Sequence, residues 1–64
     1  MDNETANNLL KQLKSKEIHE VIVSKEDFLT FREQLVKRED FKHFAGNAKH
    51  GGITVYTYHD VARS

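Results

Sequence analysis

The chain has 64 residues and no cysteine, and its ten basic residues balance its ten acidic residues. This length allows one domain, spanning 1–64, which would bury only roughly 60% of the surface of its unfolded chain. Disulfides and thiolate metal sites are excluded. Stability must therefore come from a modest core, a metal held by histidine and carboxylate, or a second subunit.

The composition also restricts location and partners. No apolar run approaches the ~20 residues of a membrane-spanning helix. Residues 1–4 lack the basic start of a signal peptide. We therefore expect a cytoplasmic protein without a membrane partner. A balanced overall charge gives no reason to expect a polyanionic partner, although residues 41–64 carry three basic residues against Asp60 alone.

Two segments have helical periodicity. After a frayed start at 1–4, the apolar residues of the first helix recur at helical spacing and form a narrow stripe, comprising Ala6, Leu9, Leu10 and Leu13. Asp2 or Asn3 is the candidate N-cap. A second helix is predicted over Ser24–Arg38, with Ser24 as its N-cap. Its apolar stripe consists of Phe28, Phe31 and Leu35, with Leu29, the stem of Arg32 and Val36 on its flanks.

Two segments have strand character. Ile18–Ser24 is rich in β-branched residues, and Ile53–Asp60 alternates cleanly. In the second of these, Tyr56 and Tyr58 share one face with Thr54, while the other face consists of Ile53, Val55 and Thr57.

The segment between the second helix and the second strand is less clear. We favour a break near Glu39–Asp40, then a short helical turn ended by Gly46, then a loop over Asn47–Gly52. The alternative is that the second helix continues to Ala45. The Gly51–Gly52 pair permits positive φ angles in the loop.

This order predicts a small α+β domain: helix, strand, helix, short helix or loop, strand. The helices pack on a two-stranded sheet that is either parallel or antiparallel, with a frayed tail at 61–64. Two strands leave two exposed edges, which proteins usually pair or cover. We therefore expect a homodimer whose sheet extends to four strands.

Metal, anion and catalytic sites have little support. The histidines His43, His50 and His59 lack the compact spacing of a zinc site, even with Asp40 and Asp60 as oxygen ligands. The Ala48–Gly52 loop resembles a phosphate loop but leads into a strand. No serine has the setting of an activated nucleophile. We therefore predict a non-enzymatic protein with no metal and no cofactor.

The remaining candidate site is a binding surface. Tyrosines are typical of protein interfaces, and a strand edge can accept a partner's strand. We predict a protein-interaction module, adaptor or inhibitor-like, that binds another protein or itself through its strand edge and an exposed tyrosine face. Its predicted binding residues are Tyr56, Tyr58, Phe44, Lys49 and His50. The alternative is a weak nucleic-acid-binding protein that stacks bases on the two tyrosines beside the basic loop.

Overall fold

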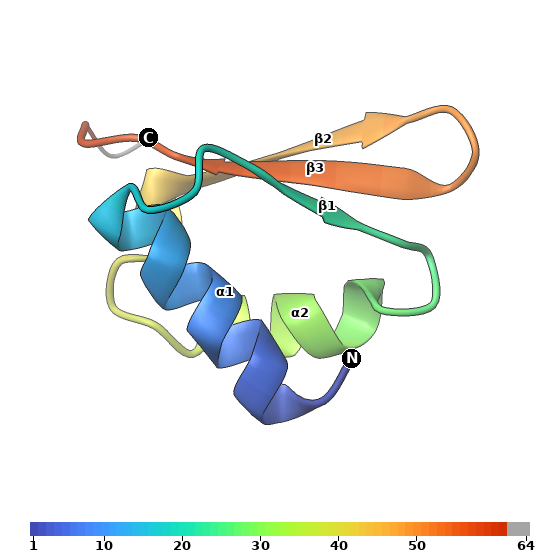
Figure 1. The fold of residues 1–64 in the computed structure, drawn as a ribbon, viewed down its shortest axis with the longest axis horizontal. Helices are drawn as coiled ribbons and strands as arrows, with labels where there is room; N and C mark the ends of the chain where they lie inside the picture. The colour runs from blue at the N-terminus through green and yellow to red at the C-terminus, as the bar shows by residue number, and fades with distance from the viewer. Residues whose placement is uncertain (62–64) are drawn as a thin grey trace.

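In the computed structural model, which describes residues 1–61, two helices pack on one face of a three-stranded antiparallel sheet (Figure 1). The elements are α1 (Asn3–Ser15), β1 (Val21–Val23), α2 (Phe28–Val36), the 3-10 helix η1 (Phe41–His43), β2 (Phe44–Lys49) and β3 (Ile53–Tyr58). The α+β class is confirmed, but the sheet has three strands where two were predicted. The tail predicted at 61–64 lies outside the described residues except for its first position.

Helix α1 is closed at both ends by local hydrogen bonds. The Thr5 backbone N–H donates to Asp2 Oδ1 at 2.7 Å, so Asp2 is the N-cap. Lys16 ends the helix in the left-handed conformation, at φ 66°. The predicted apolar stripe faces the core, with Leu10 and Leu13 fully buried. The helix begins at Asn3, inside the range that was expected to be frayed.

Helix α2 is shorter than its predicted range. Ser24 was expected to cap it, but the Ser24 hydroxyl instead donates to Asp27 Oδ2 at 3.1 Å. The Asp27 N–H donates to the Ser24 carbonyl oxygen at 3.1 Å, which makes a separate turn before the helix. The helix therefore starts at Phe28, and it ends at Val36. Phe31 and Leu35 of its predicted stripe are buried, whereas the flanking Leu29 and Val36 are exposed.

Strand β2 was not predicted from the sequence. The break near Glu39–Asp40 is confirmed, but the helical turn is limited to η1 and the strand occupies the range predicted as a turn and a loop. Alanine, glycine, asparagine and lysine, which make up most of β2, are depleted in strands. Pairing with β3 along all six residues forms the strand nonetheless. Gly51 and Gly52 close the hairpin at φ 83° and 76°, as their pattern predicted.

The strand order is β1-β3-β2, so β3 is the central strand. Both of its neighbours run antiparallel to it, which resolves the choice that the sequence left open. Only three residues of the predicted Ile18–Ser24 strand pair with it. Val21 lies opposite Tyr56, and Tyr56 lies opposite Gly46 on the other side.

The core is organised around the ring of Tyr56. This ring packs against Phe31 of α2, with 4.7 Å between ring centroids. It also extends across the sheet and lies over Gly46 of β2. A Cβ atom added to Gly46 would be 2.9 Å from Tyr56 Cε1 and 3.3 Å from Cζ. Gly46 is therefore required by the close approach of this ring.

We predict that Gly46→Ala lowers the free energy of unfolding by about 1–3 kcal/mol, because the ring of Tyr56 must move away from β2, which disturbs its packing against Phe31. The measurement is urea unfolding of a double-mutant cycle with Tyr56→Leu. The alanine should cost little in the Tyr56→Leu background, where the ring is absent. An equal cost in both backgrounds would contradict this account of Gly46.

Candidate functional site

The two tyrosines of β3 face the helices, which corrects the expectation that they lie on an exposed outer face. Tyr56 is only 5% exposed, and Tyr58 is half-buried. The ring of Tyr58 stacks on His43, with 5.4 Å between centroids, and meets Phe44 edge-on at 5.1 Å. Both rings are thus packed against other rings of the chain.

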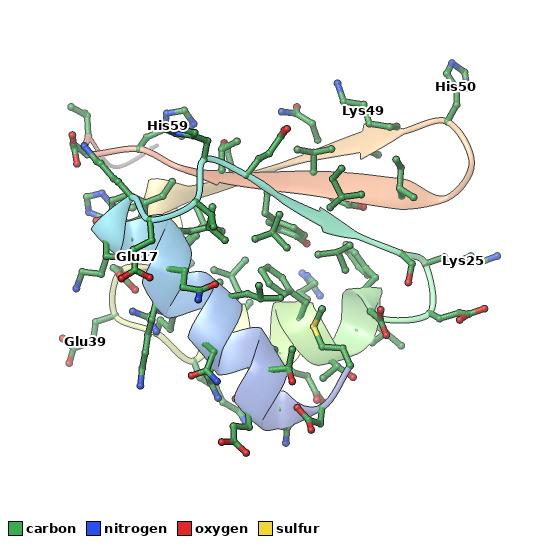
Figure 2. All side chains as sticks on the ribbon, viewed as in Figure 1. Glu17, Lys25, Glu39, Lys49, His50 and His59 are labelled. Atoms are coloured by element: carbon green, nitrogen blue, oxygen red, sulfur yellow. The ribbon has the colours of Figure 1, made fainter. Side chains whose placement is uncertain are left out.

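The other three predicted binding residues do not join the tyrosines in one site. Phe44 is buried on the inner face at the start of β2. Lys49 and His50 are exposed at the opposite end of the strand, where the hairpin turns (Figure 2). The five residues therefore divide into an inner aromatic cluster and a basic hairpin tip.

The outer face of the sheet carries no helix (Figure 1). Ile22 of β1 is 62% exposed there, and its cross-strand partner Val55 is half-buried. Ile53 and Thr57 share this face with Val55, because alternate residues of a strand point the same way. We call Ile22, Ile53, Val55 and Thr57 the open face. Three of its four side chains are apolar and β-branched, which suits packing against another protein surface.

The outer edge of β2 has free backbone groups. The His59 N–H donates to the His43 carbonyl oxygen at 2.8 Å, one step beyond the β2–β3 ladder. In an antiparallel ladder, hydrogen-bonded pairs alternate with pairs whose backbone groups point outward. Phe44, Gly46 and Ala48 therefore direct their N–H and C=O groups away from β3, and the Phe44 N–H is donated to the Phe41 carbonyl oxygen. The free edge of β2 thus consists of the Phe44 C=O group and the N–H and C=O groups of Gly46 and Ala48.

A shallow hollow adjoins this edge at the hairpin end. Its volume is about 240 Å³, and its lining is formed by Lys25, Phe28, Ala48, Lys49, Gly52, Ile53 and Thr54. The Lys25 side chain packs over Gly52, at 3.4 Å from the position of an added Cβ. The hollow is thus an apolar depression between the start of α2 and the hairpin, next to Ala48 of the free edge.

A second hollow, of about 470 Å³, is polar and lies at the opposite end of the sheet, lined by Lys14, Arg38, Glu39, Asp40 and His43. Arg38 Nε donates to Asp40 Oδ1 at 2.9 Å, and Lys14 Nζ lies 3.7 Å from Asp40 Oδ2. Partial burial raises the pKa of Asp40, but hydrogen bonding and positive charge from Arg38, with a smaller effect of Lys14, bring it below the usual value. Asp40 therefore links α1 to the segment after α2.

His43 at the rim of this polar hollow is held in place by the end of the sheet. Its Nδ1 lies 2.8 Å from the His59 carbonyl oxygen, which can only accept, so Nδ1 carries the hydrogen. Within residues 1–61, no group of three or more histidine, aspartate or glutamate side chains is placed to hold a metal ion. Lys14, Arg38, Asp40 and His43 of this hollow thus make polar contacts with other parts of the fold.

These features define a small two-layer α+β protein with an open sheet face and one free strand edge. Residues 3–57 match the family model of the YkzS-like proteins, and the chain belongs to this family. No curated protein and no solved structure matches the chain. In the described part of the chain, neither helix has the length and apolar character needed to cross a membrane.

The residues of the free edge of β2 were not predicted from the sequence as a binding surface. Gly46 and Ala48 were assigned to a turn and a loop. Leu29 and Val36 were placed beside the apolar stripe of the second helix, yet they are 72% and 52% exposed. The signal that was available is the Gly51–Gly52 turn in front of an alternating strand, which is typical of a hairpin and implies a strand on its other side.

We predict that Asp40→Asn lowers the free energy of unfolding at neutral pH. The substitution should also make this free energy less dependent on pH in the acid range. The pKa of Asp40 in the folded state lies below the unfolded value of about 3.9. Its stabilising contribution is therefore complete above the unfolded value and is lost as pH falls through the folded value. Urea unfolding between neutral pH and pH about 3 measures this. Glu39→Gln is the control, since Glu39 is exposed. Parallel stability curves for Asp40→Asn and the wild type would contradict the prediction.

Proposed function

We propose that this chain is a small protein-interaction module, adaptor or inhibitor-like and without enzymatic activity, that accepts an extended segment of another protein along the free edge of β2. The observation that carries the proposal is the free edge itself. In this six-residue outer strand, Gly46 and Ala48 have outward N–H and C=O groups, and Phe44 has an outward C=O group. A cytoplasmic location is part of the proposal.

The sequence of β2 supports use of this edge. Proteins usually block an exposed edge with proline, with several charges, or by making the strand very short. β1, the other edge, follows the last rule because it has only three residues. β2 follows none of them, since its only charged residue is Lys49 at its end. An added strand would find an uncharged template from Phe44 to Ala48.

The surroundings of the edge supply side-chain contacts in addition to backbone hydrogen bonds. The apolar hollow beside Ala48 can take one side chain of the added segment on the inner side. On the outer side, Lys49 and His50 are exposed at the rim (Figure 2). Alternate side chains of an added strand face these two sides, which is how strand addition obtains specificity.

We predict that selection of a random peptide library against the immobilised chain enriches peptides that need the β2 edge. Their affinity should fall about tenfold or more in Ala48→Pro, because proline removes an outward N–H and fills its space. That N–H has no role in the β2–β3 ladder, so the fold should remain, as circular dichroism can verify. The matched control is Ile22→Pro, which removes an outward N–H from the β1 edge and should bind as the wild type does.

Two results would contradict the proposal. One is a library that enriches no peptide, or only peptides that bind Ala48→Pro and wild type equally. The other is salt-sensitive binding of a labelled single-stranded oligonucleotide in place of peptides, which would favour the nucleic-acid alternative.

A further inference from the structure

The free edge of β2 offers only a few backbone groups to an added strand. The Phe44 N–H is donated to the Phe41 carbonyl oxygen, so complete pairs can form only opposite Gly46 and Ala48. Backbone hydrogen bonds of this kind are the same for every sequence. The side chains around Gly46 and Ala48 must therefore decide which segment binds.

The inner side of the edge is apolar at both positions. In an antiparallel pair, directly opposite residues have their side chains on the same face of the sheet. The residue opposite Ala48 therefore points toward the apolar hollow, whose lining includes Phe28 and Thr54. The residue opposite Gly46 meets the ring of Tyr56, because this ring covers the inner side of the glycine. Two positions of an added strand thus favour apolar side chains.

The size of the hollow suits one side chain. Its volume is about 240 Å³, which is below the roughly 300 Å³ at which pockets for small-molecule ligands begin. The hollow also lies directly beside a backbone that can hold an extended segment. It therefore fits a single apolar side chain of such a segment better than a separate small molecule.

The rim of the hollow is positively charged. Lys25 and Lys49 contribute to its lining, which contains no acidic residue. Both lysines are exposed, and their side chains extend away from the body of the fold (Figure 2). Among the ion pairs within residues 1–61, none involves either lysine. The fold itself thus leaves these two charges without a counterion.

The acidic residues nearest to Lys25 in the sequence do not change this. Asp27 accepts a hydrogen bond from the Met1 amino group at 2.8 Å, which lowers the pKa of Asp27. Glu26 is exposed and takes part in none of the ion pairs of residues 1–61. An acidic side chain from a partner would complement the charge of this end of the sheet.

The direction of the added segment fixes the order of its residues. Both strand pairs of the sheet are antiparallel, which is also the more frequent arrangement in proteins. In an antiparallel segment, the residue opposite Lys49 comes directly before the residue opposite Ala48. Its side chain lies on the outer face with that of Lys49. Opposite charges on directly opposite residues stabilise a strand pair.

We propose that β2 selects an antiparallel segment in which an acidic residue is followed directly by a large apolar residue. The acidic side chain lies opposite Lys49, and the apolar side chain lies opposite Ala48 and enters the hollow. Two residues further along, a second apolar side chain lies opposite Gly46 and packs against the Tyr56 ring. The recognised pattern is thus acidic, apolar, any residue, apolar. This rests on the proposed function, because it names the sequence that the same edge binds.

The test is selection of a random peptide library against the immobilised wild type and three variants, followed by sequencing of the enriched peptides. The wild type should enrich the pattern. Lys49→Glu should enrich a basic residue in place of the acidic one and keep both apolar positions. Ala48→Leu keeps the N–H but fills the hollow, so small residues should replace the first apolar one. Lys11→Glu makes the same charge change on the exposed side of α1 and should enrich the wild-type pattern.

The affinity of one peptide with the pattern gives the magnitudes. Lys49→Glu should weaken its binding about fivefold at low salt, and the loss should shrink as ionic strength rises. Ala48→Leu should weaken binding about tenfold or more at any salt concentration. Lys11→Glu should leave the affinity unchanged. Fluorescence anisotropy of the labelled peptide measures these affinities, and circular dichroism verifies that each variant is folded.

Several outcomes would overturn the recognition pattern. Peptides that need the Ala48 N–H but share no acidic–apolar pair would do so, while the proposed function would stand. The reverse order, with the acidic residue after the apolar one, would show a parallel segment. An acidic residue that Lys49→Glu still enriches would show that Lys49 does not select it. A library that enriches no peptide would contradict the pattern and the proposed function together.

Discussion

The structure depends on the contact between the Tyr56 ring and Gly46. Tyr56 belongs to the central strand, its ring crosses the edge strand, and its face packs on Phe31 of α2. One side chain thus fixes the positions of three elements. The contact requires a residue without Cβ on β2, because an alanine there would be 2.9 Å from the ring. The position of α2, and therefore the flank that it exposes, follows from this contact.

The second constraint is that the two helices cover only one face of the sheet. Among residues 1–61, no further helix covers the open face around Ile22 and Val55, and no further strand pairs with the free edge of β2. Proteins usually pair, cover or block such an edge. The proposed partner segment would pair with the edge of β2.

The two ends of the sheet have different roles in this picture. At one end, Asp40 joins α1 to the segment after α2 through Lys14 and Arg38, and its polar groups are engaged with one another. At the other end, Lys49 and His50 of the hairpin are exposed, and the apolar hollow beside Ala48 is open. The polar end therefore contributes to the fold. The hairpin end and the adjoining edge remain available to a partner.

The sequence by itself determined the elements whose pattern is local. The periodicity of α1, the apolar stripe of α2 and the alternation of β3 were all correct, because spacing alone decides which residues share a face. The tertiary structure decided which face of β3 the helices cover, and Tyr56 lies on that covered face. It also decided that Phe44–Lys49 is a strand, since pairing with β3 overrides weak local propensity. The free edge could not be read from the sequence, because outward backbone groups exist only once a strand has one partner and lacks another.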